Sequence, residues 1–119
     1  MTWFHRLLAD RLLDVEERRV RRLIVAMPPR HGKTELVSRL WPAWLFRGSR
    51  PLRIIACSHT ANLAEQNSRD VRRIMQSRRY RAAFPSATIP IAHTDQRLKS
   101  TAGHWELPTG GVYRAAGVG

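Results

Sequence analysis

The stretch that most constrains this chain runs from residue 23 to residue 35, where a short apolar segment leads into Gly-Lys-Thr. Residues 23–27 (LIVAM) have the length and composition of a buried strand. Two prolines follow, and a helix-forming run begins at Lys33. A strand, a tight loop, Gly-Lys-Thr and a helix in this order are typical of a phosphate-binding loop. The stretch therefore predicts a site for a nucleoside triphosphate.

Each residue type in this loop has a chemical reason to be there. Gly32 lets the backbone pass close to a phosphate, because it has no Cβ. Free N–H groups at the start of the following helix favour an anion. Lys33 would place a compact charge on the β- and γ-phosphates, and the Thr34 hydroxyl would be a ligand for Mg²⁺. The predicted nucleotide-binding residues are Arg30, His31, Gly32, Lys33, Thr34 and Glu35.

The loop departs from the common pattern G-x-x-x-x-G-K-[ST] at its first glycine, which is Met27 here. Pro28 and Pro29 also remove two amide donors and stiffen the loop entry. The phosphate cradle would therefore have to form from Arg30 onward. A chance Gly-Lys-Thr at a strand-to-helix turn is the alternative interpretation.

Residues 27–34, MPPRHGKT, resemble the Walker A segment of the large terminase subunits, the ATPases that pump DNA into tailed-phage heads. Residues 57–74 and 105–119 resemble two further segments of that family, and the likeness covers nearly the whole chain in the family's order. The resemblance implies an α/β, three-layer P-loop core of the RecA/helicase-like kind, with a parallel sheet, incomplete here, and a C-terminal β-hairpin. Residues 1–119 would be a partial ATPase domain, with an N-terminal helix and connector (1–22) and a P-loop core fragment (23–119).

The resemblance also implies a function. The chain would be the ATP-binding part of the motor that translocates and packages phage DNA, with ATP and Mg²⁺ as cofactors. Implied partners are double-stranded DNA, the portal and the small terminase subunit, in a ring oligomer in the cytoplasm of a bacterial host. Arg30 would reach the γ-phosphate and act with Lys33 in catalysis; the alternative is an arginine with no catalytic part.

Hydrolysis needs an acidic residue after a buried strand to hold Mg²⁺ and a group that orients water. None of the nine acidic residues follows an apolar strand of the right kind. The family's Walker B acids and nuclease domain would lie beyond residue 119, so we expect a truncated lobe without turnover of its own. Two alternatives remain: another helicase-like P-loop DNA ATPase, or a decayed, non-catalytic prophage fragment that binds DNA non-specifically.

The charge of the chain points to an acidic partner. The net charge is +12 and the pI about 11.7. Only Lys33 and Lys99 are lysines, so the codon bias of a GC-rich genome accounts for part of the excess. Arg69, Arg72 and Arg73 share one face of a predicted helix, and Arg78, Arg79 and Arg81 follow it. The first three are the candidates for DNA contact, with Arg78 and Arg79 flanking them; the alternative is a solvated face. The single cysteine excludes an internal disulfide, and a cytoplasmic compartment fits.

The remaining elements follow from apolar spacing and from proline and glycine. The N-terminal helix is amphipathic, lacks the continuous apolar run of a membrane span or signal, and is expected to pack on the sheet. Pro42 should interrupt the helix over 33–47 near Leu40, and Trp41 and Trp44 are assigned to the core. A second strand (52–57) would complete a βαβ unit with the first. Next come a helix capped by Thr60 and running to about residue 76, a break over 80–86, a short strand (88–92), a polar loop (94–102) and a hairpin pairing 104–107 with 112–116.

Overall fold

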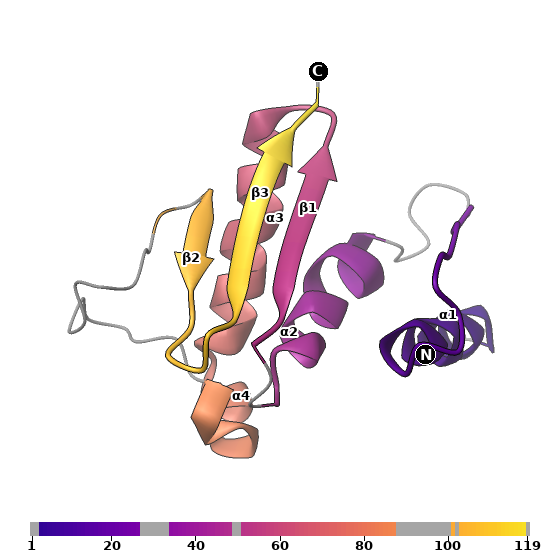
Figure 1. Cartoon of the computed structure of the whole chain (residues 1–119), viewed down its shortest axis with the longest axis horizontal. Helices are drawn as coiled ribbons and strands as arrows, with labels where there is room; N and C mark the ends of the chain where they lie inside the picture. The colour runs from indigo at the N-terminus through magenta and orange to yellow at the C-terminus, as the bar shows by residue number, and fades with distance from the viewer. Residues whose placement is uncertain (1–2, 27–33, 49–50, 88–100, 102, 119) are drawn as a thin grey trace.

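The computed structural model describes residues 3–26, 34–48, 51–87, 101 and 103–118, which form a small α/β unit (Figure 1). Its helices are α1 (Trp3–Glu16), the π-helix η1 (Thr34–Leu40), α2 (Trp41–Leu45), α3 (Ala61–Met75), α4 (Arg78–Ala83) and the 3₁₀ turn η2 (Pro85–Ala87). Its strands are β1 (Arg53–Ser58), β2 (His104–Glu106) and β3 (Val112–Gly117).

The three strands form one sheet in the order β1-β3-β2. β3 lies in the middle, parallel to β1 and antiparallel to β2, so the sheet is mixed where a parallel sheet was predicted. Ile54 pairs with Tyr113, and Tyr113 pairs with Trp105 on the other side. Between the parallel neighbours β1 and β3 the chain forms α3, α4, η2 and β2. The predicted βαβ unit of residues 23–57 is wrong, because residues 23–26 do not form its first strand.

The segment predicted as the first strand is not a strand over its described residues. Residues 23–26 have no regular structure, Ile24 is 95% exposed, and residue 27 lies outside the described part. Figure 1 places this segment on the α1 side, with η1 and α2 between it and β1. A short apolar run forms a parallel strand only where a neighbouring edge can pair with it. Here the described segment does not meet one.

The core lies between α3 and one face of the sheet. The Trp105 and Tyr113 rings are stacked 4.9 Å apart with both side chains fully buried, and Phe46 packs 5.5 Å from Trp105. Trp105 Nε1 donates a hydrogen bond of 2.8 Å to Ser68 Oγ on α3. Because this bond satisfies the indole N–H, Trp105 can be buried without leaving a donor unpaired.

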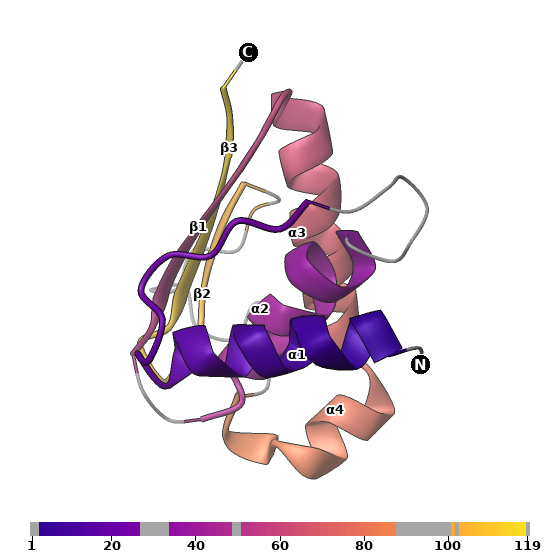
Figure 2. The ribbon, with the colours of Figure 1, turned by 90° about the vertical axis from the view of Figure 1, so that its right-hand side faces the viewer.

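The helices gather on one side of the sheet (Figure 2). On the other face Ile55 is 70% exposed, and Cys57 and Arg114 are also exposed. Strand register places Ile55 beside Arg114 and Cys57 beside Ala116 on this face. The described residues thus form two layers, where a three-layer core was predicted.

Two glycines fix the C-terminal hairpin, which was predicted correctly. Gly110 has a φ of 93° in the turn, a conformation that favours glycine, and its N–H donates to the carbonyl of Leu107. Gly117 ends β3 against the start of α3, where an added Cβ would lie 2.4 Å from the backbone nitrogen of Ala61. Glycine is needed there because the two backbones approach too closely for a side chain.

Most helix ends follow the sequence signals. The helix after residue 33 changes from η1 to α2 at Leu40, as predicted, because Pro42 has no N–H to continue the ladder. Thr60 Oγ1 accepts from the N–H of Leu63 at 3.2 Å and caps α3, also as predicted. The break predicted over 80–86 is wrong, since α4 occupies 78–83. It is capped by Ser77 and anchored by Tyr80, whose hydroxyl donates to the Ala43 carbonyl at 2.7 Å.

The amphipathic helix α1 forms as predicted but does not lie on the sheet. Leu8 and Leu12 are its buried residues, and Leu12 lines a pocket with residues of η1, α2, α3 and α4. Figure 2 shows α1 beside these helices. Glu16 at its end accepts hydrogen bonds from Trp44 Nε1 at 3.1 Å and from Arg47 at 2.7 Å. Trp44 is consequently half-exposed beneath Arg47, and its assignment to the core was wrong.

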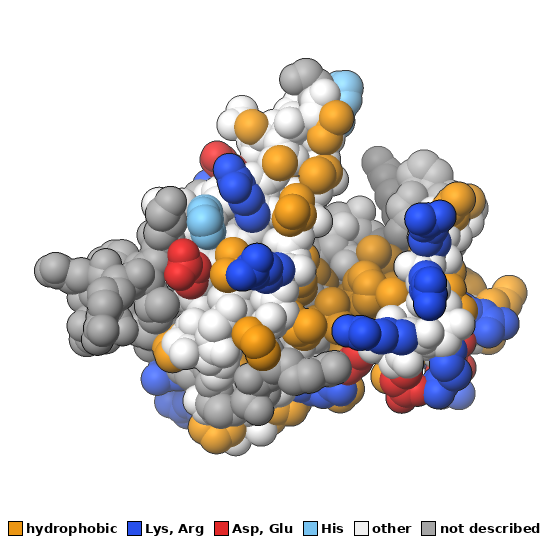
Figure 3. Space-filling view, viewed as in Figure 1, with side chains coloured by type: hydrophobic (Ala, Val, Ile, Leu, Met, Phe, Trp, Pro, Cys, Tyr) orange, Lys and Arg blue, Asp and Glu red, His pale blue; other side chains and the backbone are white. Residues whose placement is uncertain are grey.

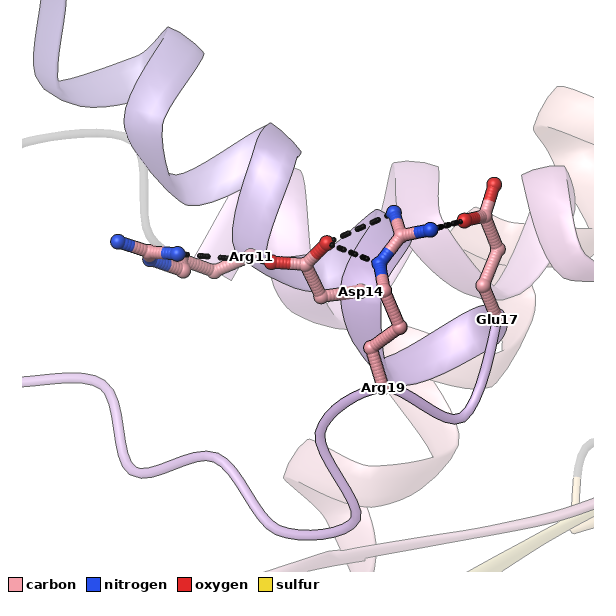
Figure 4. A network of polar contacts seen from close by, with 4 residues as sticks. All are labelled: Arg11, Asp14, Glu17 and Arg19. Carbon is pink, nitrogen blue, oxygen red and sulfur yellow. Dashed lines mark hydrogen bonds and ion pairs between the residues drawn. The ribbon is translucent and has the colours of Figure 1, made fainter.

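A surface ion network closes the end of α1. Asp14 accepts from Arg11 and from Arg19, and Arg19 also pairs with Glu17 (Figure 4). Hydrogen bonding to Asp14, followed by the charge of Glu17, raises the pKa of Arg19 above its ordinary value. The network compensates several charges at this end of the molecule but is solvent-exposed, so it contributes little to stability.

Candidate functional site

The predicted nucleotide-binding residues fall on both sides of the boundary of the described structure. Arg30, His31, Gly32 and Lys33 lie outside the described residues. Thr34 and Glu35 are the first residues of η1, and both are exposed. The described residues from Thr34 onward are helical, as the helix predicted over 33–47 requires.

Thr34 is compatible with the predicted Mg²⁺ contact. It lies at the N-terminal end of a helix, and its side chain is exposed, as a hydroxyl that reaches a cation beside bound phosphates must be. Glu35 is engaged elsewhere, because it accepts a hydrogen bond of 3.0 Å from Arg39 Nη1. Arg39 also contacts Asp70 on α3 at 3.0 Å, so this chain of ion pairs fastens η1 to α3.

Among the residues with defined positions, no group of three or more His, Cys, Asp or Glu side chains could hold a metal ion. The strand ends that meet the start of α3 carry Ser58 and Gly117, and neither is a carboxylate. Of the described helices, none combines the length and apolar character that crossing a bilayer requires.

The three predicted DNA-contacting arginines lie on α3 but differ in their surroundings. Arg69 is exposed. Arg72 is half-buried and donates to the Thr101 carbonyl at 3.4 Å, and burial lowers its pKa. Arg73 pairs with Asp70 at 3.4 Å. Two of the three are therefore already engaged with the protein.

The structure adds a hollow beside the arginines that follow α3, which the sequence did not predict. Arg78 and Arg81, one helical turn apart on α4, line a surface hollow of about 540 Å³ together with Gln76, Ala82 and Pro85. The charge run was visible in the sequence. The hollow was not, because it requires α4 to form and the chain to turn back at Pro85.

A more apolar groove of about 450 Å³ lies between α1 and the helices η1, α2, α3 and α4. Its walls come from α1 and from η1, α2, α3 and α4, with Glu16 and Asp10 among its few polar residues. The face of the helix over 33–47 that was predicted to be core, including Leu36, Leu40, Trp41 and Trp44, lines this groove.

The chain was compared with protein families, curated proteins and solved structures. The chain matches no protein-family model, no curated protein and no solved structure.

Proposed function

We propose that this chain is the ATP-binding part of a terminase large subunit, the motor that translocates and packages phage DNA. The observation that carries the proposal is the Gly32-Lys33-Thr34 tripeptide at the start of a helix, in a segment that resembles the family's Walker A. The α/β arrangement, with α3 packed on two parallel neighbouring strands, is compatible with a P-loop core. Such a protein would act in the cytoplasm, in a ring with its portal and small-subunit partners.

In this proposal Lys33 holds the phosphates, Thr34 contacts Mg²⁺, and backbone N–H groups from Arg30 to Glu35 complete the cradle. Mg²⁺, when bound, would neutralise charge on the phosphates. Arg30 would contact the γ-phosphate. Binding the ground state does not accelerate hydrolysis, so the chain alone is expected to bind ATP without turnover.

Titration with a fluorescent ATP analogue tests the nucleotide site. Lys33→Ala removes a charge-assisted contact worth roughly 1.5–3 kcal/mol, so affinity should fall about tenfold or more. Lys99→Ala is the matched control, because Lys99 is the chain's only other lysine and the substitution changes the net charge equally. If both variants bind the ATP analogue as tightly as the wild type, the proposed nucleotide site is wrong.

A phosphate-release assay on the same samples tests the catalytic part. We expect no release above background from the wild-type chain. Robust release that disappears in Lys33→Ala would show that a catalytic acid lies within these residues.

A second candidate function, DNA binding without nucleotide hydrolysis, is favoured by the arginines of α3 and α4. It requires neither Lys33 nor Thr34. Unchanged DNA affinity in Lys33→Ala, alongside lost ATP-analogue binding, would separate the two functions in one preparation.

A further inference from the structure

We propose that the hollow between Arg78 and Arg81 binds phosphate groups of the duplex DNA backbone, and that α4 contacts DNA more strongly than the arginine face of α3. This inference rests on the DNA part of the proposed function and is independent of the nucleotide site. It places the contact in a hollow that the sequence did not predict, lined by Gln76, Arg78 and Arg81.

α4 presents its arginines outward because one residue holds it to the body of the protein. Tyr80 is buried, donates to the Ala43 carbonyl at 2.7 Å, and packs 5.1 Å from the Phe84 ring. With Tyr80 directed inward, Arg78, Arg79 and Arg81 are all exposed. The helix is therefore a fixed platform for three cations.

The charge on this platform is not compensated nearby. No acidic residue lies between Asp70 and Asp95 in the sequence, while five arginines do: Arg72, Arg73, Arg78, Arg79 and Arg81. Within the described part of the chain, no ion pair involves an α4 arginine, whereas Arg73 pairs with Asp70. Blue side chains appear along the lower margin of Figure 3, where Figure 1 places α4.

The surroundings of α1 differ in this respect. Four of the nine acidic residues, Asp10, Asp14, Glu16 and Glu17, lie in or directly after α1. Asp14, Glu16 and Glu17 pair there with Arg11, Arg19 and Arg47. A polyanion that approaches α4 therefore meets three exposed arginines without an acidic partner among the described ion pairs.

The chemistry of the hollow fits a phosphodiester backbone. Two guanidinium groups one turn apart can each donate paired hydrogen bonds to phosphate oxygens, and the Gln76 amide can add a neutral donor. Of the residues whose positions are described, none that lines the hollow is acidic. Exposed contacts of this kind are individually weak, so a chain of phosphates is favoured over a single small anion.

Fluorescence anisotropy with a labelled DNA duplex, measured across a salt series, tests the proposal. Arg78→Gln/Arg81→Gln should weaken binding at least tenfold at low salt. It should also reduce the slope of log affinity against log salt by about 2, because two phosphate contacts are lost. Urea unfolding should be unchanged, since both side chains are exposed.

Arg21→Gln/Arg22→Gln is the matched control, because both residues are exposed, lie after α1, and change the net charge equally. It should weaken binding by less than half as much. Equal losses in the two double variants would overturn the proposal, as would the absence of duplex binding by the wild-type chain. Tighter binding to anionic phospholipid vesicles than to DNA would overturn it too.

The ATP-analogue titration distinguishes this inference from the nucleotide proposal. The α4 double variant should bind the analogue like the wild type. Lys33→Ala should bind DNA like the wild type even if the nucleotide site is real. If Lys33→Ala loses no analogue affinity while the α4 variant loses DNA, the nucleotide proposal fails and the DNA site stands.

Discussion

Two regions of this small protein are joined in different ways. The unit of α3 and the sheet is held by side chains with no exposed surface, among them Val71, Met75, Trp105 and Tyr113. α1 contributes only Leu8 and Leu12 as buried residues and is tied by the single carboxylate of Glu16. The difference teaches that most of the stability comes from the C-terminal unit. α1 can detach at a low cost in free energy, because it buries little apolar surface.

The largest effect should come from the centre of the C-terminal unit. Trp105→Ala removes the ring stacked on Tyr113 and the bond to Ser68, so we expect a loss of about 3–5 kcal/mol in unfolding free energy. Urea unfolding followed by circular dichroism measures it. Trp3→Ala, at a side chain 76% exposed on α1, should change stability by less than about 0.5 kcal/mol.

If Trp105→Ala does not fold, Trp105→Phe keeps a ring against Tyr113 and should give a smaller loss. Equal losses from Trp105→Phe and Trp3→Ala would show that the C-terminal unit does not dominate stability.

A second strong effect is expected where β3 meets α3. Gly117→Ala would place a Cβ 2.4 Å from the Ala61 nitrogen and 2.8 Å from its Cα, so the start of α3 must shift. We expect a loss of about 1–3 kcal/mol, as for other overpacked sites. Gly48→Ala is the control, because an added Cβ there meets nothing within 4 Å. A Gly117→Ala protein as stable as Gly48→Ala would contradict the close approach of the two backbones.

The same comparison shows which parts of the fold can be predicted from the sequence. Local signals predicted the C-terminal unit well: the Thr60 cap, the glycine turn before β3 and the strand over 52–57 depend on neighbouring residues. The strand predicted over 23–27 and the position of α1 depend on which distant surface each segment meets. Apolar periodicity carries no information about that choice.

The candidate sites differ in the same way: one follows from a local motif, and the other depends on how the chain folds. Thr34 at a helix start followed from a local motif. α4 was missed because Phe84-Pro85 suggested a break, although Ser77 is a good cap and the residues after it favour a helix. Without α4, nothing in the sequence brings Arg78, Arg81 and Pro85 around one hollow.

Tyr80 belongs to the buried core and gives an intermediate, pH-dependent effect. Burial raises its pKa from 10.0 to about 12, partly opposed by the charge of Arg47. Because the folded pKa is the higher one, its contribution is fully present below about pH 10 and is lost as the pH rises toward 12.

Tyr80→Phe removes the bond to the Ala43 carbonyl, so it should be about 1 kcal/mol less stable than the wild type at pH 8. Urea unfolding of both proteins from pH 8 to pH 11.5 should show this gap closing at the alkaline end. Tyr113, whose pKa burial also raises, titrates in both proteins and cancels in the difference. A gap that stays constant through pH 11.5 would place the hydroxyl in a solvated environment.

The smallest effect on global stability, and the sharpest test of the comparison, concerns Glu16. Its side chain accepts hydrogen bonds from Trp44 and Arg47. Among the described contacts, these two residues make no other hydrogen bond or ion pair with α1. Glu16→Gln keeps the shape and removes the charge, at a local cost of roughly 1 kcal/mol. Amide exchange of Leu8 and Leu12 should therefore accelerate about fivefold, while the urea midpoint of the C-terminal unit stays unchanged. Glu17→Gln is the control, one residue away, with the same charge change and only the exposed Arg19 as its ion-pair partner. If Glu16→Gln lowers the global midpoint in proportion to the faster exchange, α1 belongs to the same cooperative unit as the sheet, and the contrast between the two regions disappears.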